Sequence, residues 1–144
     1  MSADLIAKLE AATKGIRELD ADVARAAGMI VWSYDDNCHI DAQIENGNWE
    51  GRKRDHPDYV PRPRVTWRVT ADRDKPGIDL PAYTTSLDAA LTLVPEGWDY
   101  CLSMGSGEPA NVAMSPANSI AEVHGSAPSA ALALCIAALK ARSA

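Results

Sequence analysis

Several features that would point to a particular class of protein are missing from this sequence. Phenylalanine is absent, so four tryptophans and four tyrosines supply all the large aromatic side chains. The three cysteines are odd in number and scattered, which argues against a disulfide framework. We expect two of them, Cys101 and Cys135, to be small core residues. Apolar runs are too short to span a membrane and no N-terminal signal pattern is present, so we expect a cytoplasmic protein without a membrane partner.

A surplus of positive charge is also missing. The chain has 20 acidic and 14 basic residues, which gives a formal net charge of −6. Proteins that bind nucleic acids in general usually carry a basic surplus, so this charge argues against general nucleic-acid binding. It leaves room for a local basic site. The chain has 144 residues and is 47% hydrophobic, which predicts a single domain, 1–144, with a substantial core.

A helix, a stop and a strand are predicted in succession over residues 83–104. Four apolar residues recur there at helical spacing: Leu87, Ala90, Leu91 and Val94. Thr85 and Asp88 resemble a capping pair at the start of this helix. Pro95 disfavours its continuation. From Trp98 the apolar period changes to two, which predicts a strand.

The same patterns predict the remaining elements. Further helices are expected over residues 2–12, 16–27 and 128–142, and the core face of the last helix consists of Leu132, Cys135, Ile136 and Leu139. Further strands are expected over 29–34, 65–69, 110–114 and 120–124. We also expect an edge hairpin with a first strand over 39–45, a turn at Asn46-Gly47 and a return strand from Trp49. This order predicts an α+β fold with helices packed on a mostly antiparallel sheet.

Three blocks of the sequence resemble the phage ABA sandwich domain family of small phage and prophage proteins. They are IRELDADVARAAG, YTTSLDAALTLVPEGW and APSAALALCIAALKARSA, and the central block is the most specific. The resemblance implies an αβα sandwich with an N-terminal helix pair, a central helix and a C-terminal helix, in a phage or prophage setting. It carries over no catalytic residues. Residues from about 35 to 64 lie outside the shared pattern, which is consistent with an insertion.

Motifs for catalysis or metal binding are scarce. Asp35, Asp36, Cys38, His39 and Asp41 lie close together, but their spacing matches no standard zinc pattern, so a solvated turn and edge strand is favoured. The sequence has no glycine-rich phosphate-binding loop, and its three histidines have no cysteine or serine partner by motif. We therefore expect no metal, no cofactor and no enzymatic activity.

A basic and aromatic segment is the strongest positive signal for function. Its residues are the cations Arg52, Lys53, Arg54, Arg62 and Arg64, opposed by Asp55 and Asp58, and the interleaved rings of Trp49, His56, Tyr59 and Trp67. Arginine forks bind phosphate, and aromatic faces stack on bases. The predicted ligand-binding residues are Arg52, Arg54, Arg62, Arg64, Trp49, Tyr59 and His56. The alternative is a solvated, proline-rich loop whose charges protect a sheet edge from aggregation.

Two functions remain open at this point. The first is a non-enzymatic phage or prophage accessory protein that binds an anionic, nucleotide-like ligand. Such a protein would sequester a host signalling nucleotide in the host cytoplasm, with a homo-oligomer interface as one place to hold it. The second is a protein–protein interaction module that docks on a host or virion protein through an acidic surface or the edge hairpin.

Overall fold

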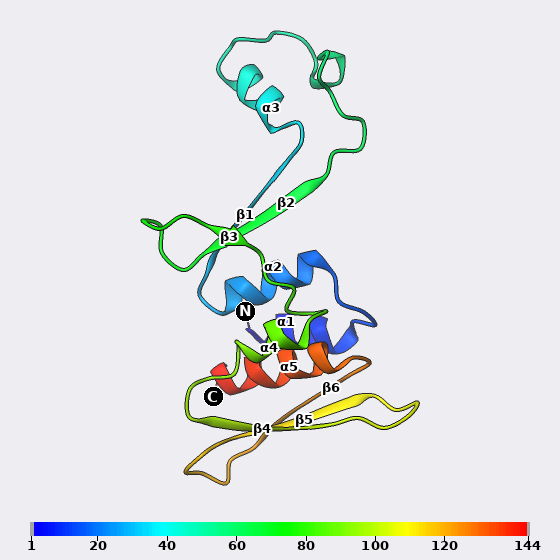
Figure 1. Cartoon of the computed structure of the whole chain (residues 1–144), viewed down its shortest axis with the longest axis vertical. Helices are drawn as coiled ribbons and strands as arrows, with labels where there is room; N and C mark the ends of the chain where they lie inside the picture. Colours follow the sequence, from blue (N-terminus) through cyan, green and yellow to red (C-terminus); the bar gives the residue numbers. More distant parts are fainter. Residues whose placement is uncertain (1, 144) are drawn as a thin grey trace.

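The computed structural model of the chain describes residues 2–143 and combines helices with antiparallel strands (Figure 1). The helices are α1 (Ser2–Ala11), α2 (Arg17–Ala26), α3 (Cys38–Glu45), α4 (Leu87–Leu91), α5 (Ala130–Ser143) and the 3-10 turn η1 (Lys53–Asp55). The strands are β1 (Ile30–Asp35), β2 (Val65–Thr70), β3 (Ile78–Asp79), β4 (Trp98–Ser103), β5 (Ala110–Pro116) and β6 (Val123–Ala127). The α+β class is confirmed, as are the N-terminal helix pair, the central helix and the C-terminal helix.

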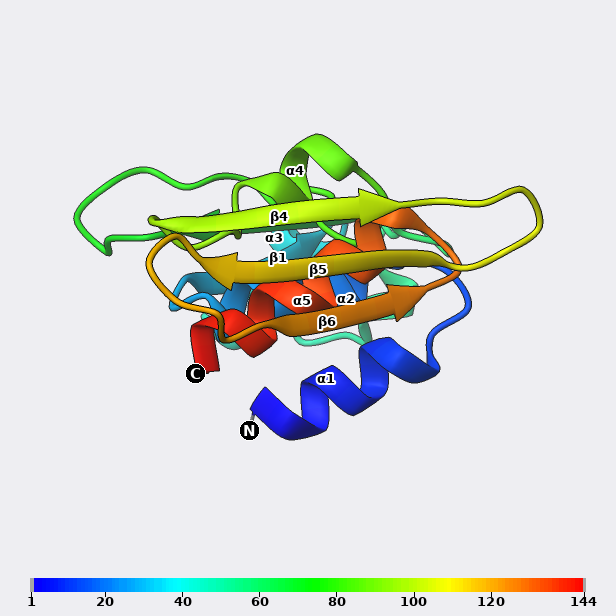
Figure 2. The same cartoon turned by 90° about the horizontal axis from the view of Figure 1, so that it is seen from below.

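The described strands form two separate sheets, with strand orders β1-β2-β3 and β4-β5-β6 and antiparallel pairing throughout. Helices α1, α2, α4 and α5 lie between the two sheets (Figure 1). Figure 2 shows the β4–β6 sheet in front, with α5 against its inner face. The antiparallel expectation is therefore confirmed, and the layer order differs from the expected sandwich because the strands are divided between two sheets rather than gathered in one.

Helix α5 supplies the centre of the core. Its expected core face is buried, and so are the alanines around the rest of the helix, Ala131, Ala133, Ala137, Ala138 and Ala141. It contacts β5 and β6 on one side and α1 and α4 on others. A side chain at Gly125 of β6 would collide with the Ala133 carbonyl oxygen, so strand and helix are packed as closely as backbones allow. None of the described helices is long and apolar enough to cross a membrane.

The carboxylate of Asp20 in α2 is fully buried and ties this helix to the segment before α4. Its Oδ1 atom accepts hydrogen bonds from the backbone N–H and the hydroxyl of Thr84, at 2.7 and 2.6 Å. Its Oδ2 atom accepts a hydrogen bond from Arg17 at 2.8 Å. The Arg17 guanidinium also donates to the Leu80 carbonyl oxygen at 2.6 Å. Because a buried charge is costly unless it is paired and hydrogen-bonded, these contacts fix α2 against residues 80–84.

The expected edge hairpin over 39–49 is wrong, because residues Cys38–Glu45 form helix α3. Ile40 and Ile44 lie four residues apart, so they satisfy helical spacing as well as alternation. Ile40 is fully buried, whereas Ile44 is 37% exposed. The pattern of so short a segment fits both structures, and the helix is the one that buries Ile40.

The Asn46-Gly47 pair ends this helix instead of turning a hairpin. Gly47 has a φ of 76° and donates its N–H to the Ile44 carbonyl at 3.1 Å. The next N–H, that of Asn48, donates to the Gln43 carbonyl at 2.8 Å. These two bonds form a Schellman motif, which satisfies carbonyl groups at the end of a helix. The chain then continues through Trp49 as a loop and not as the expected return strand.

Two smaller expectations also need correction. Helix α4 is capped by Ser86 and not by Thr85, because the Ser86 hydroxyl accepts the Ala89 N–H at 3.4 Å. The last strand is Val123–Ala127 and not 120–124, because its pairing with β5 places alternating residues from Val123 onward against α5, and Ile120 is fully exposed.

The three cysteines occupy different environments. Cys135 is buried in α5, where its thiol donates to the Tyr83 carbonyl at 3.1 Å and where burial raises its pKa to about 12. The expectation of a core position is confirmed for Cys135 and wrong for Cys101, which is exposed. Alternation along β4 places Cys101 opposite Ala113 on the outer face of the sheet, away from α5. Cys38 is exposed at the start of α3.

We expect Asp20→Ala to lower the free energy of unfolding by about 3 kcal/mol, because the buried Thr84 N–H loses its acceptor and the Thr84 hydroxyl keeps only the Ile16 carbonyl. The matched control is Asp22→Ala in the same helix, whose carboxylate makes surface ion pairs of 3.3 Å with Lys8 and Arg25. That control should cost less than about 1 kcal/mol. Urea unfolding of both variants measures the difference. Similar losses in the two variants would contradict the role assigned to Asp20.

A thiol titration tests the burial of Cys135. At about pH 8 we expect Cys38 and Cys101 to react with a disulfide reagent in the native protein, because both are exposed. Cys135 should react only after denaturation, because its pKa of about 12 keeps it protonated and α5 shields it. Rapid reaction of all three thiols in the native protein would show that the core around α5 opens readily.

Candidate functional site

All seven predicted ligand-binding residues lie in the segment between β1 and β2, which contains α3 and η1 and is drawn at the top of Figure 1. We call it the 36–64 segment. Asn37 is fully buried and links the beginning of this segment to its end. The Asn37 side-chain amide donates to the Val60 carbonyl at 2.9 Å and accepts the Val60 N–H at 2.8 Å. Asp36 adds a second bridge, because its carboxylate accepts the Arg64 N–H at 3.1 Å.

The four predicted arginines are exposed along this segment. Arg52 and Arg54 lie around η1, Arg62 lies between two prolines, and Arg64 directly precedes β2. Within residues 2–143 their guanidinium groups form no ion pair or hydrogen bond with protein atoms. Lys53 differs, because it donates to Asp41 at 3.0 Å and lies 4.0 Å from Asp35. The hydrogen bond to Asp41 is the largest cause that raises the pKa of Lys53.

Two of the predicted aromatic residues are in contact with each other. The rings of Trp49 and His56 meet at a centroid distance of 4.7 Å and an angle of 60°. A side chain at Gly51 would lie 2.9 Å from Trp49 Nε1, so the indole is also packed against the backbone. Within the described residues, Trp49 Nε1 is buried without a hydrogen-bond partner. Tyr59 is half-buried nearby, and its N–H donates to the His56 carbonyl at 3.0 Å. Base stacking by Trp49 and Tyr59 stays a prediction.

One of the arginines, Arg64, lines an open groove of about 580 Å³. The other lining residues are Arg17, Glu18, Val65, Thr66, Trp67 and Asp79, from α2, β2 and β3. The charges in this groove are not equivalent. Asp79 is paired with Arg68 at 2.7 Å, and Arg17 is paired with the buried Asp20 at 2.8 Å. The free charges presented to a ligand are therefore those of Arg64 and Glu18.

The sequence pattern missed Arg17 and Glu18 as groove residues. They open helix α2 and lie far from Arg64 in the sequence, so only the tertiary structure brings them together. The preceding N-cap residue, Ile16, offers no side-chain hydrogen bond to the first turn. The N–H groups of that turn therefore add positive potential at this end of the groove.

The acidic cluster near α3 is dispersed into separate structural contacts. Asp35 accepts the Asn37 N–H at 2.8 Å, Asp36 accepts the Arg64 N–H, and Asp41 binds Lys53. Together with Cys38, Asp35 and Asp41 line a second open groove of about 280 Å³. The fifth member of the cluster, His39, lies beside His56 and Asp58.

Comparison of the chain with protein-family models, with curated proteins and with solved structures finds no match. The resemblance of three sequence blocks to the phage ABA sandwich domain family therefore stays a prediction.

Proposed function

We propose that this chain is a non-enzymatic protein that binds an anionic, nucleotide-like ligand through the basic residues of the 36–64 segment. The observation that carries the proposal is the state of Arg52, Arg54, Arg62 and Arg64. Their guanidinium groups are exposed and make no contact with a carboxylate within the described residues, although the protein has 20 acidic residues. Arginine groups held without an internal partner are available to bind phosphate in a bidentate manner.

The groove beside Arg64 offers the chemistry that a nucleotide-like ligand needs. Arg64 and the first turn of α2 supply positive potential for a phosphate group. Glu18 lies in the same groove and supplies an acceptor for a sugar hydroxyl. Trp67 supplies a half-buried indole on the groove wall. A cation, a hydroxyl acceptor and an aromatic surface in one groove favour a nucleotide over a bare inorganic anion.

The biological setting of this proposal rests on the sequence alone. The resemblance of three blocks to phage and prophage proteins supports an accessory protein of the host cytoplasm. In that setting, sequestration of a host signalling nucleotide is a role that needs binding and no catalysis.

A protein–protein interaction module is the second candidate, and a specific surface favours it. The edge hairpin expected for docking is helix α3, so it offers no free strand. Strand β1 does form one edge of its sheet, and its outer face exposes Ile30, Trp32 and Tyr34 at 39, 39 and 47%. Edge strands with apolar side chains are common sites of pairing between chains.

We expect nucleotides and cyclic nucleotides to raise the melting temperature of the wild-type protein, because a ligand at about 100 times its Kd adds about 2.7 kcal/mol to stability. A variant with Arg52, Arg54, Arg62 and Arg64 replaced by glutamine should keep its circular dichroism spectrum and lose this shift. Arg64→Gln alone should cost about 1.5–3 kcal/mol of binding, typical of a hydrogen bond to a charged group. Binding should weaken as salt is raised.

The matched control is Arg73→Gln with Lys75→Gln, which removes two exposed cations from the loop between β2 and β3. It should leave ligand binding unchanged. If the four-fold glutamine variant binds as well as the wild type, the anion site is wrong. The interaction module then becomes the favoured function, and Trp32→Ala and Tyr34→Ala become the variants that should abolish partner binding.

A further inference from the structure

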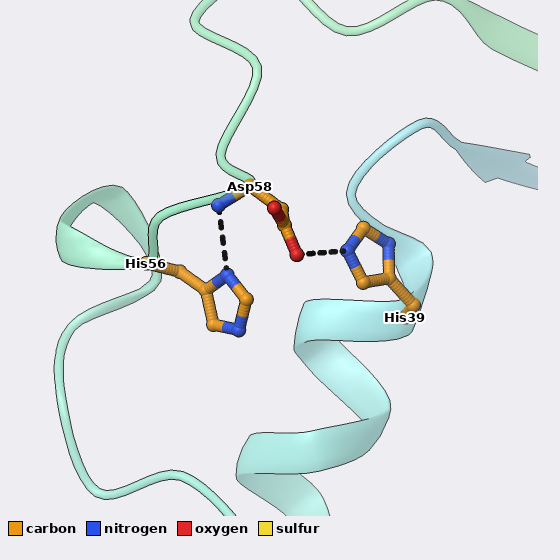
Figure 3. A group of neighbouring side chains, drawn as sticks. All are labelled: His39, His56 and Asp58. Carbon is orange, nitrogen blue, oxygen red and sulfur yellow. Dashed lines mark hydrogen bonds and ion pairs between the residues drawn. The ribbon is translucent and has the colours of Figure 1, made fainter.

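The fold brings together three potential metal ligands that are separated in the sequence. Figure 3 shows His39 on the first turn of α3, with His56 and Asp58 on the loop that follows η1. One ring nitrogen of each histidine and one carboxylate oxygen of Asp58 lie within 4.8 Å of one another. The separation between His39 Nε2 and Asp58 Oδ2 is 3.9 Å. The two imidazole rings are 6.0 Å apart, edge to face.

Hydrogen bonds engage both ring nitrogens of His56 and show which tautomer the ring adopts. The backbone N–H of Asp58 can only donate, and it points at His56 Nδ1 at 3.1 Å. Nδ1 is therefore unprotonated, so in the neutral ring Nε2 carries the hydrogen. That Nε2–H faces Gln43 Oε1 in α3 at 2.9 Å. The single lone pair of Nδ1 accepts the Asp58 N–H, so a metal ion at Nδ1 takes the place of this hydrogen bond and requires the exposed loop at Asp58 to turn its N–H to water.

This arrangement has the features of a metal site with an outer shell. Histidines that bind metals usually donate their second ring N–H to a fixed oxygen acceptor, as His56 does to Gln43. His39 and Asp58 have side chains that are 47 and 71% exposed, so both can rotate towards an ion. Tetrahedral zinc needs ligand atoms about 3.3 Å apart, given Zn–N bonds of about 2.0 Å. Closing the remaining gaps takes rotation of these two exposed side chains and displacement of the Asp58 N–H from His56 Nδ1.

We propose that His39, His56 and Asp58 form a binding site for a divalent transition-metal ion, with Zn²⁺ as the best match. Two imidazoles and one carboxylate suit zinc, and three protein ligands leave positions open for water or an anion. The ion would close the 36–64 segment by joining α3 to the loop after η1. The proposal goes beyond the proposed function, because it needs none of the four arginines. The sequence predicted no metal here because His56 and Asp58 join His39 only through the fold.

Calorimetric titration of the full, metal-free chain with ZnCl₂ tests the site. We expect one equivalent of Zn²⁺ to bind with micromolar affinity in the absence of nucleotide. His39→Ala and Asp58→Asn should each weaken binding at least about tenfold, and both variants should stay folded because the side chains are exposed. Gln43→Ala should weaken binding about tenfold through the orientation of His56, whereas Gln43→Glu should retain it, because a carboxylate accepts the same Nε2–H.

Two controls separate this site from other zinc-binding groups. His124→Ala removes the remaining histidine, which lies beside Glu122 at 3.0 Å, and should leave the affinity unchanged. Cys38→Ser removes the exposed thiol next to His39 and should also leave it unchanged. Nitrogen-15 spectra of the imidazoles should show zinc on Nε2 of His39 and on Nδ1 of His56. The proposal would be overturned by absence of saturable binding, by wild-type affinity in His39→Ala or Asp58→Asn, or by loss of binding in Cys38→Ser.

Discussion

The hydrogen bonds of the buried Asp20 carboxylate are the interaction on which the relative position of the two sheets depends. The two sheets share no strand pairing in the described structure, so they are related only through the helices and the chain between them. Asp20 joins α2 to Thr84, and the adjacent Tyr83 receives the Cys135 thiol at its carbonyl and points its hydroxyl at the Met29 sulfur, 3.6 Å away. One short stretch, residues 83–84, therefore contacts α2, the chain before β1, and α5. Such a junction tolerates a buried charge because both carboxylate oxygens are hydrogen-bonded.

The 36–64 segment differs from this core in the kind of interaction that holds it together. Its buried residues are Asn37 and Ile40, and polar bonds such as those between Asn37 and Val60 hold it together. Segments held in this way open at lower free-energy cost than a packed core, and binding functions are often placed on them by a rigid scaffold. Both the proposed anion site and the proposed metal site lie on this segment. A ligand or ion there would supply order that apolar burial does not.

The parts of the fold that were predictable from the sequence are those in which one pattern has a single interpretation. The period-two alternation from Trp98 predicted β4, the pattern over 110–114 predicted β5, and the helical spacing over 16–27 predicted α2. Residues 39–45 were misread because Ile40 and Ile44 satisfy both periods and Gly47 suits a helix end as well as a hairpin turn. The basic segment could be recognised because its arginines are neighbours in the chain. Arg17 and Glu18 beside Arg64, and Asp58 beside His39, could not, since only the packing of α2 and the course of the loop after η1 create those pairs.

The position of α5 in the sequence has a consequence for how the protein is made. This helix follows every other described element, yet β5, β6, α1 and α4 all pack against it. A ribosome releases a chain from its N-terminus, so the elements that surround α5 emerge while the helix at their centre is still to be synthesised. Their apolar faces stay open to water and to other chains during that interval. Completion of the core therefore waits for the synthesis of α5, and the yield of folded protein depends on how well the cell shields the nascent chain until this helix emerges.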